Sequence, residues 1–257
     1  MFILLSPAKS LDFATPAPVK TTSALLFEKD ALYLASLAAR LSSPQLQTMM
    51  GISPSLADLN VERFAAIVNA TAPAKQAIFA FDGDVYTGLE SHTLGVRSLN
   101  YLQKHVRILS GMYGMLRPFD LMYAYRLEMG STLKNAAGAS LYAYWSDKLS
   151  AYLQAEVSAS KSRAVINLAS EEYAKAVKLK SLSVPVIHPV FQDYSKGQYK
   201  VISFFAKRAR GAMARYCAEH QIKNPQGLKD FDSDAYRYCE EESTEAKWVF
   251  RRRVEEK

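Results

Sequence analysis

The chain has 257 residues, of which 49% are hydrophobic and 22% are charged. This composition is typical of a globular protein with one substantial core, and it excludes long intrinsic disorder. A formal net charge of +7 favours acidic partners, namely nucleic acid, phosphorylated ligands or an anionic membrane surface, although a merely basic protein would carry it as well. With only two cysteines, Cys217 and Cys239, the sequence excludes a disulfide scaffold and suits a reducing compartment.

The N-terminal apolar run is too short to cross a membrane, and no basic residue precedes it as in a secretory signal. No later apolar run is long enough to cross a bilayer either. The sequence therefore predicts a cytoplasmic protein without a membrane partner.

Apolar runs bounded by turn residues predict buried strands at 2–5, 77–81, 106–109, 165–168, 184–190 and 199–204. Helical periodicity predicts helices at 26–41, 44–50, 54–67, 141–155 and 171–177. The pattern indicates an α/β (mixed α+β) fold with a central mixed sheet and surrounding helices. We expect one domain over residues 1–257, with a helical insertion at about 31–68.

Small and polar residues follow the first four predicted strands. In open α/β sheets, ligands bind beyond the carboxyl ends of the strands. If these strands are parallel, their loops meet in one cleft, lined by Lys9, Asp84, Ser110, Ser170 and Glu171. An enzyme acting on a nucleotide, a nucleobase or another phosphorylated small molecule could use Lys9 as nucleophile or phosphate clamp and Glu171 or Asp84 as general base. The alternative is that these residues only form turns and cap helices.

The segment from Lys196 to Arg215 contains no acidic residue, and its second half is predicted to be helical. At the helical step of about 100° per residue, its cations fall on one arc with Gly211, and its apolar residues, Phe205 among them, fall on the opposite arc. A glycine costs helix stability, and a closely approaching backbone or a phosphate would explain its presence here. We expect the apolar arc to pack on the core and the basic arc to bind DNA phosphates without reading sequence. A solvated amphipathic helix and a membrane-surface helix are the alternatives. The predicted contacts are Lys200, Lys207, Arg208, Arg210, Gly211 and Arg215.

Residues 38–57 are typical of two helices joined by a tight turn that contains Gly51 and Ser53. Ser53 can cap the second helix, and Pro54 fits its first position. The pattern resembles a helix-hairpin-helix motif, in which a glycine-containing turn offers backbone N–H groups to a DNA phosphate. An ordinary corner between two helices is the alternative, because Ser53 stands where the motif usually has a second glycine.

An irregular stretch at 108–130 is rich in glycine, aromatic residues and charges of both signs, which is typical of a ligand-binding loop. Arginine can grip phosphate and tyrosine can stack on a base. The candidate contacts are Tyr113, Arg117, Arg126 and Glu128. The alternative is internal ion pairing, of Arg117 with Asp120 and of Arg126 with Glu128.

The four histidines are scattered, and the sequence contains no P-loop, dinucleotide-binding or nucleophile-elbow motif. We therefore expect no cofactor and no dedicated metal site. The acidic run Glu240–Glu242 offers hard ligands for iron, but its spacing does not favour a site.

Five long motifs resemble the YaaA family of bacterial peroxide-stress proteins. They are LLSPAKSLDF near the start, FDGDVYTGL at 81–89, ILSGMYGMLRPFDLMYAYRLEMG at 108–130, VINLASEEYAKAV at 165–177 and ISFFAKRARGAMARY at 202–216. They are collinear with the family and cover essentially the whole chain. The resemblance implies a cytosolic DNA-binding protein that limits unincorporated iron and so reduces oxidative damage, and it names no reaction. It also implies an unusual α/β fold with a helix-hairpin-helix element and a positively charged cleft, for which the turn at Gly51 and the segment from Lys207 to Arg215 are the matching positions.

Overall fold

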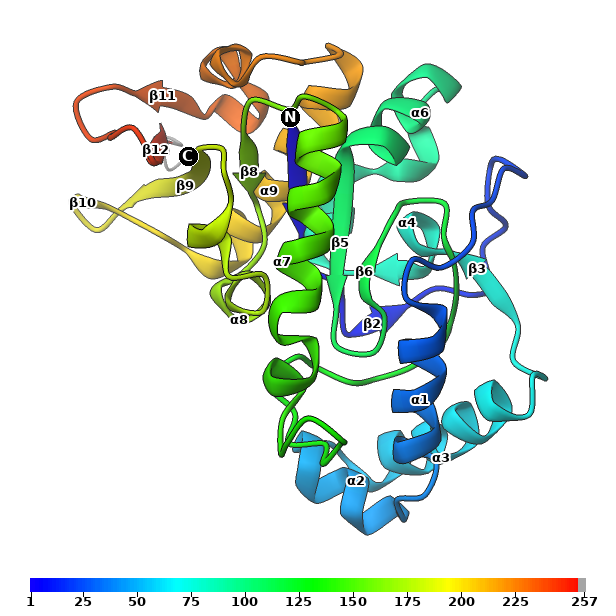
Figure 1. Ribbon diagram of the computed structural model, residues 1–257. Coiled ribbons are helices and arrows are strands. Elements are labelled where there is room, and N and C mark those ends of the chain that lie inside the picture. Colours follow the sequence, from blue (N-terminus) through cyan, green and yellow to red (C-terminus); the bar gives the residue numbers. More distant parts are fainter. Residues whose placement is uncertain (254–257) are drawn as a thin grey trace.

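The computed structural model describes residues 1–253, and over that range an eight-stranded mixed sheet forms the centre of the molecule (Figure 1). Its strands are β1 (Phe2–Leu5), β5 (Val106–Ser110), β6 (Gly114–Leu116), β8 (Val165–Asn167), β9 (Val186–Ser195), β10 (Gln198–Lys200), β11 (Arg237–Cys239) and β12 (Lys247–Arg252). Their order is β11–β12–β9–β8–β1–β5–β6, and β10 pairs with β9. Strands β12, β9, β8, β1 and β5 are parallel, whereas β6, β10 and β11 pair antiparallel.

The helices and the smaller strand pairs surround this sheet. The helices within residues 1–253 are α1 (Glu28–Ala38), α2 (Ser43–Met50), α3 (Pro54–Val68), α4 (Ala77–Ala80), α5 (Asp84–Leu89), α6 (Val96–His105), α7 (Leu141–Ala159), α8 (Glu171–Lys175) and α9 (Ser203–Glu219), with short 3₁₀ turns at Ser91–Thr93, Leu179–Ser181, Pro225–Asp230 and Ser233–Ala235. Strand β2 (Ser10–Leu11) pairs with β4 (Phe81–Asp82), and β3 (Ala74–Gln76) pairs with β7 (Leu121–Tyr123). Figure 1 shows α7 in front of the sheet, α9 behind it, and α1, α2 and α3 together at the lower end.

The predicted mixed α/β fold is confirmed, but one predicted strand is wrong. Residues 77–81 form helix α4 followed by the two-residue strand β4. Every residue of α4 is buried, and a short run that is apolar on all sides has the same pattern in a buried helix as in a buried strand. The predicted strand at 199–204 is also too long, because β10 ends at Lys200 and α9 begins at Ser203.

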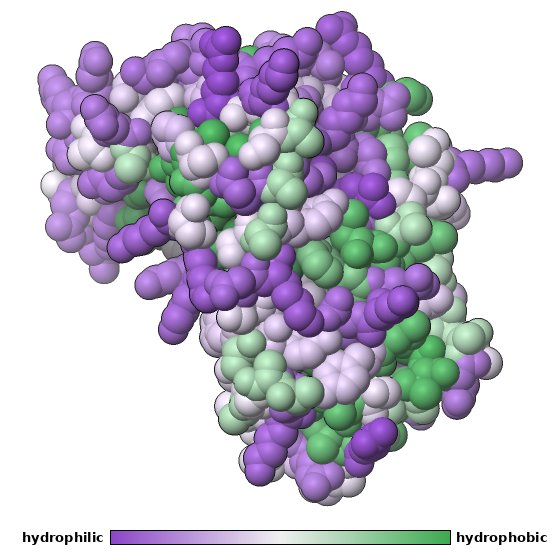
Figure 2. All heavy atoms as spheres, in the orientation of Figure 1, coloured by the Kyte–Doolittle hydropathy of each residue, from purple (hydrophilic) through white to green (hydrophobic). Residues whose placement is uncertain are grey.

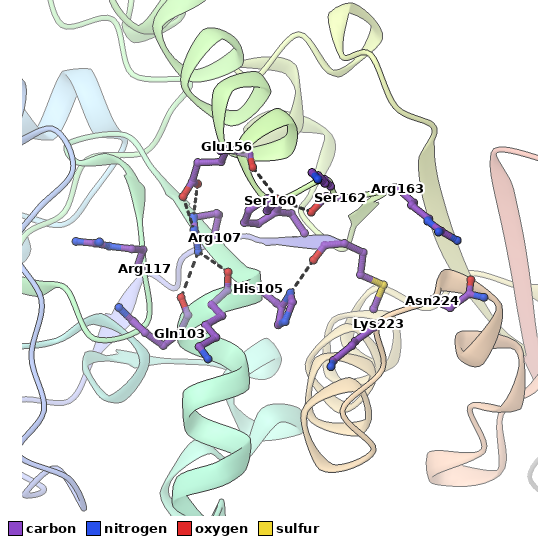
Figure 3. A pocket seen from close by; sticks show the side chains of 15 residues that line it. Gln103, His105, Arg107, Arg117, Glu156, Ser160, Ser162, Arg163, Lys223 and Asn224 are labelled. Carbon is purple, nitrogen blue, oxygen red and sulfur yellow. Dashed lines mark hydrogen bonds and ion pairs between the residues drawn. The ribbon is translucent and has the colours of Figure 1, made fainter.

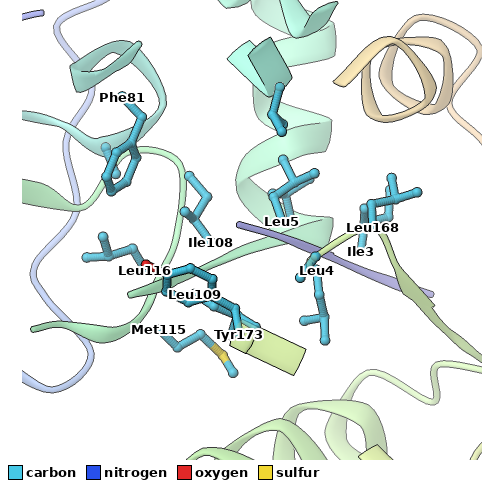
Figure 4. Packing of buried hydrophobic residues seen from close by; sticks show 14 of the residues in the cluster. Ile3, Leu4, Leu5, Phe81, Ile108, Leu109, Met115, Leu116, Leu168 and Tyr173 are labelled. Atoms are coloured by element: carbon cyan, nitrogen blue, oxygen red, sulfur yellow. The ribbon is translucent and has the colours of Figure 1, made fainter. Parts of the chain in front are cut away.

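The core is built around β1, the central strand of the sheet. Its residues Ile3, Leu4 and Leu5 are fully buried on both faces, as is typical of a parallel strand that helices cover on both sides. Figure 4 shows Leu4 and Leu5 among Ile108 and Leu109 of β5 and other buried side chains. Burying such side chains contributes roughly 1.5–3 kcal/mol each.

The order in which the chain visits the sheet places a switch point beside β1. From β1 the chain passes to β5 and β6 on one side, and it then crosses to β8, β9 and β12 on the other side. The loops after β1 and β8 therefore diverge from each other, which leaves room between the carboxyl ends of these two strands.

Helices α5 and α9 cross at two glycines, Gly88 and Gly211. A Cβ atom on Gly211 would overlap the carbonyl oxygen of Val85, and one on Gly88 would overlap the carbonyl oxygen of Arg208. The prediction that Gly211 lies on an exposed arc is therefore wrong, because this residue is buried. Of the two explanations for a glycine at this position, a closely approaching backbone is the one observed. The crossing fixes the side chains of α9 relative to α5.

The two helices predicted on either side of Gly51 are present as α2 and α3. Gly51 is left-handed, with φ 61°, and the Ser53 hydroxyl accepts a hydrogen bond from Leu56 N at 3.4 Å, so this serine caps α3 as predicted. The identity of this element as a helix-hairpin-helix motif stays a prediction.

The two ends of the molecule differ in surface chemistry. In Figure 2, hydrophilic residues dominate the upper part of the visible face, where Figure 1 places β10, β11 and β12, while apolar residues are more frequent towards α1, α2 and α3. Exposed leucines of this lower end include Leu32, Leu56 and Leu59. Among the helices of residues 1–253, none combines the length and the apolar character that a bilayer span requires.

Candidate functional site

A pocket of about 480 Å³ lies at the switch point, beyond the carboxyl ends of β1 and β8. We call it the strand-end pocket. The loop after β1, the start of α5, the loop at Glu128, the start of α8 and helix α9 all contribute to it. It is lined by Ser6, Pro7, Ala8, Lys9, Ser10, Asp82, Gly83, Asp84, Val85, Tyr86, Glu128, Ser170, Glu172, Tyr173, Lys207 and Arg210.

Hydrogen bonds between the loops fix the wall of this pocket. Ser170 N donates to Ser6 Oγ at 2.8 Å, and Ser6 Oγ lies 3.3 Å from Ser170 Oγ. The buried Tyr86 hydroxyl donates to the Ser6 carbonyl oxygen at 3.0 Å. Two strand ends that are 164 residues apart in the sequence are thereby held together, as expected for parallel neighbours.

Asp84 reaches the pocket by a route that the sequence did not predict. Strand β4, which lies just before Asp84 in the sequence, is not part of the main sheet. It pairs with β2 instead, in a register that places Asp82 opposite Ser10. That pairing brings the start of α5 beside the loop after β1, and Lys207 Nζ of α9 lies 3.7 Å from Asp84 Oδ2. The predicted juxtaposition of Lys9, Asp84 and Ser170 is therefore observed.

Glu128 is held between two cations at the rim of the pocket. Its Oε1 atom lies 3.1 Å from Lys9 Nζ and 3.0 Å from Arg126 Nη2. The Lys9 side chain is 69% exposed, so it does not occupy the dry, cationic setting that would activate a lysine as a nucleophile. Lys9 is better placed to hold a ligand or Glu128 than to attack a substrate.

Arg210 enters the pocket without a protein partner. Within residues 1–253 its guanidinium makes no ion pair or hydrogen bond, although burial lowers its pKa. Its side chain also lines a second hollow, of about 990 Å³, which we call the lysine pocket. That pocket includes Asn167, Glu171, Lys175, Lys178, Lys180 and His188. A partly buried, unpaired guanidinium has donors that can pair with an anion.

Tyr173 adds a hydrogen-bond donor to the pocket. Burial is the main cause that raises the pKa of its phenol, and the neighbouring Tyr125 and Glu172 raise it further. Tyr173 therefore stays protonated over the physiological range.

Two predicted strand-end residues are not in the strand-end pocket. Ser110 is fully buried, and its Oγ lies 2.5 Å from the Tyr125 hydroxyl and accepts from Tyr113 N at 2.9 Å. It therefore stabilises the turn after β5 instead of facing a ligand. Glu171 lines the lysine pocket, while its neighbour Glu172 faces the strand-end pocket and accepts a hydrogen bond from Gly130 N at 2.9 Å.

Most of the predicted ligand loop is internal structure. Tyr113 is buried, and its hydroxyl donates to the Tyr123 carbonyl oxygen. Arg117 Nε lies 2.9 Å from Asp120 Oδ1, and Arg126 pairs with Glu128. The ion pairs considered as the alternative are thus both formed, and Glu128 is the one candidate of this loop that lines the strand-end pocket.

The basic helix α9 does not present one basic face. Arg215 donates to the carbonyl oxygens of Leu89 and Glu90 and forms ion pairs with Glu90 and Glu219. Lys207 and Arg210 turn towards the pockets. Phe205, predicted to pack on the core, is 38% exposed, and Phe204 is 49% exposed. The predicted division into a basic arc and an apolar arc is wrong in these positions.

The exposed start of α9 instead belongs to a surface where arginines lie over aromatic rings. Arg208 lies 5.8 Å from the ring centre of Phe204, and Arg252 of β12 lies 4.6 Å from that of Phe205. The two phenylalanine rings are 5.6 Å apart. We call this the aromatic–arginine surface; its members are Tyr194, Tyr199, Phe204, Phe205, Arg208, Arg251, Arg252 and Arg253.

Strands β9 and β10 continue this surface. Tyr194 and Tyr199 are opposite each other in the register, with ring centres 5.2 Å apart. Arg253 lies 4.4 Å from the Tyr194 ring, and Arg251 lies 4.5 Å from the Tyr199 ring. Lys200, a predicted DNA contact, is the next residue of β10. No periodic pattern in the sequence could predict this surface, because its rings come from three elements.

A third hollow lies at the opposite edge of the sheet, by the amino end of β1 (Figure 3). This amino-edge hollow has a volume of about 860 Å³. Figure 3 shows its carboxylate, Glu156, facing Arg107, with which it forms a pair at 2.6 Å. Other cations around it make no ion pair within residues 1–253; they are Lys104, Lys161, Arg163 and Lys223. It is a further basic surface that an acidic partner could use.

The described residues 1–253 contain no group of three or more histidine, cysteine, aspartate or glutamate side chains that could hold a metal ion. In the acidic run considered for iron, Glu242 pairs with Arg251 at 3.0 Å.

Comparison with known proteins gives a consistent result over the whole length. The family model described as "Peroxide stress protein YaaA" matches residues 1–242. A UPF0246 protein of Janthinobacterium sp. (strain Marseille) is 50% identical over 256 residues, covering 99% of each chain. UPF0246 proteins of Paraburkholderia phytofirmans and Alteromonas mediterranea are 49% and 48% identical, with at least 99% of each chain covered.

Proposed function

We propose, from the premise that the chain belongs to the YaaA family of peroxide stress proteins, that it binds DNA in the cytoplasm as part of the response to hydrogen peroxide. The consequence for the cell would be less oxidative damage from unincorporated iron, as the family resemblance implies. The observation that carries the proposal is the aromatic–arginine surface.

Single-stranded DNA is the form that this surface fits best. Base stacking on an exposed aromatic ring requires an unpaired base, and it contributes about 1–3 kcal/mol per base. Phe204 and Phe205 are exposed large aromatic side chains next to arginines. Arg208 and Lys200 can neutralise phosphates on either side of the stacked bases, since neither forms an ion pair within residues 1–253. A surface of this kind binds without reading sequence.

The proposal is tested by titrating the full chain with a labelled single strand and its duplex at several salt concentrations. We expect Phe204→Ala to weaken single-strand binding about fivefold or more, without changing the salt dependence. Arg208→Gln is expected to lower the slope of log affinity against log salt by about 0.7, the value for one phosphate contact on a single strand. The stacking and the ionic contributions are thereby separated.

Matched variants elsewhere provide the controls. Leu32→Ala removes an exposed apolar side chain from α1, and Arg97→Gln removes an exposed cation from α6. Both should bind as the unaltered chain does. A triple change of Lys161, Arg163 and Lys223 to Gln tests the amino-edge hollow. Loss of binding in that triple variant, with Phe204→Ala and Arg208→Gln unaffected, would place DNA in the amino-edge hollow and refute the proposal.

A further inference from the structure

We propose that the strand-end pocket binds a small phosphorylated molecule of the sugar phosphate or nucleotide class, with Arg210 and Lys207 holding its phosphate. This inference does not depend on DNA binding. It rests on the position of the pocket, on the state of Arg210 and on the mixture of charges in the pocket wall.

The position is the one where open α/β sheets bind ligands. The pocket lies between the carboxyl ends of β1 and β8, the two neighbouring strands from which the chain departs in opposite directions. Its volume of about 480 Å³ lies within the range of roughly 300–1,000 Å³ that is usual for small-molecule sites. Its wall is fixed by the hydrogen bonds between Ser6 and Ser170, so the hollow exists before a ligand arrives.

The unpaired state of Arg210 indicates that the ligand carries an anionic group. An arginine that loses water on folding without gaining a carboxylate destabilises the protein. Arg215, five residues further along α9, is enclosed by ion pairs, so this helix can satisfy an arginine where no ligand is needed. The guanidinium of Arg210 offers a planar pair of donors that suits a phosphate. Lys207 also lines the pocket, and its 3.7 Å distance from Asp84 is too long for a strong hydrogen bond, which leaves its ammonium available.

The carboxylates of the pocket indicate the remainder of the ligand. Asp82, Asp84, Glu128 and Glu172 contribute carboxylates to the same pocket. A ligand that was only an anion would be repelled by them, whereas the hydroxyl groups of a sugar can donate hydrogen bonds to them. The combination of cations on α9 and carboxylate acceptors in the same pocket therefore favours a phosphorylated sugar or nucleotide over inorganic phosphate.

The lysine pocket is the rival location for an anion at Arg210. Two of its lysines are already engaged: Lys178 lies 2.5 Å from Asp147, and Lys175 lies over the Tyr142 ring at 5.1 Å. It also has the larger volume, and it has a single carboxylate, Glu171, where the strand-end pocket has four. Lys180, which lines only the lysine pocket, can distinguish the two locations.

The inference is tested by calorimetric titration of the full chain with ribose 5-phosphate, adenosine monophosphate, inorganic phosphate and adenosine. We expect one of the two phosphorylated organic probes to bind at least tenfold more tightly than inorganic phosphate or adenosine. Arg210→Gln should weaken that binding tenfold or more, and Lys207→Gln should weaken it severalfold. Arg63→Gln is the matched control, because Arg63 is another partly buried arginine without an ion pair within residues 1–253, and it lines none of these pockets.

Several results would overturn the inference. They are the absence of binding of either phosphorylated organic probe at roughly millimolar concentrations, unchanged binding in Arg210→Gln, and a loss in Lys180→Gln without a loss in Lys207→Gln. Arg210→Lys retains the charge and covers the case in which Arg210→Gln does not fold. Single-stranded DNA affinity measured on the same variants should stay unchanged, so failure of this inference and failure of the proposed DNA binding are distinguishable.

Discussion

The two halves of helix α9 carry the same kind of sequence but have opposite surroundings. Its first half, at Phe204, Phe205 and Arg208, is exposed or partly exposed, and its arginine lies over a ring. In its second half, Gly211 is buried against α5, and Arg215 is surrounded by carbonyl oxygens and carboxylates. Arginines seven positions apart therefore serve different purposes: one is available to a partner, and the other fastens α9 to the loop after α5. The number of cations on a helix therefore does not show how many of them are available to a partner.

The largest effect that this comparison predicts is on stability, for the change Gly211→Ala. The new methyl group would overlap the backbone of α5 at Val85, and backbone cannot rotate away as a side chain can. We expect the free energy of unfolding to fall by about 3 kcal/mol or more, measured by urea denaturation.

The matched control is Gly51→Ala, where the glycine is left-handed but no atom lies within 4 Å of the added Cβ. Only the backbone strain remains there, so a smaller loss of about 1–2 kcal/mol is expected. If Gly211→Ala were as mild as this control, the second half of α9 would not be closely packed, and the contrast between the halves would disappear.

The error at Gly211 shows what the sequence could and could not predict. The strands at 2–5, 106–109 and 165–168 were predictable because each is a mainly apolar run followed by a turn residue, and each forms a fully buried strand. Parallel pairing of two of them then brings Ser6 and Ser170 together. A helical wheel, by contrast, assumes that a helix meets the core along one face. It contains no information about α5, a six-residue helix that occupies the face assigned to phosphates.

The candidate site was also predictable in part, because parallel pairing brings the loops at the strand ends together. Lys9, Asp84 and Ser170 meet as the strand-end hypothesis expected. Ser110 follows a strand in the same way as Ser170, but its hydroxyl turns inward to Tyr125. The direction of a side chain in a turn depends on a residue elsewhere in the chain, so the spacing of residues alone could not separate these two serines. Arg210 was predicted as a DNA contact, and only its position between two hollows indicates a small anion.

An intermediate effect is expected for Arg215→Gln. The Arg215 side chain is 23% exposed, and it bridges Glu90 and Glu219. Removing its charge leaves two carboxylates without their partner, and after allowance for partial screening we expect a loss of about 1–2 kcal/mol in the free energy of unfolding. Single-strand DNA affinity, compared at equal fraction folded, should remain within about twofold.

Arg208→Gln is the reciprocal measurement for this prediction. It removes a cation that has no ion pair within residues 1–253, so its effect on stability should stay below about 0.5 kcal/mol, while DNA affinity falls. A large stability loss in Arg208→Gln together with lost DNA binding in Arg215→Gln would reverse the roles that we assign to the two halves.

The smallest effect is expected at Cys217, which should not react at all while the protein is folded. It lies in the second half of α9 and is fully buried, and burial raises the pKa of its thiol to about 12. At pH 8 only about one thiol in ten thousand would be the reactive thiolate. Cys239 is partly exposed beside Arg251 of the aromatic–arginine surface. Mass spectrometry after alkylation with iodoacetamide, or after brief exposure to peroxide, should therefore find the modification on Cys239 and not on Cys217.

Combining this assay with Gly211→Ala makes it a probe of the helix crossing. A loss of 3 kcal/mol would raise the population of opened molecules by about a hundredfold, and Cys217 should then be labelled through the opened state at a correspondingly higher rate. If Cys217 and Cys239 were labelled equally in the unaltered chain, the second half of α9 would open so readily that burial gives Cys217 no protection. Protection of Cys217 that survives Gly211→Ala would mean that α5 can shift to accept the methyl group, and that Arg215, not the glycine crossing, holds this half of the helix in place.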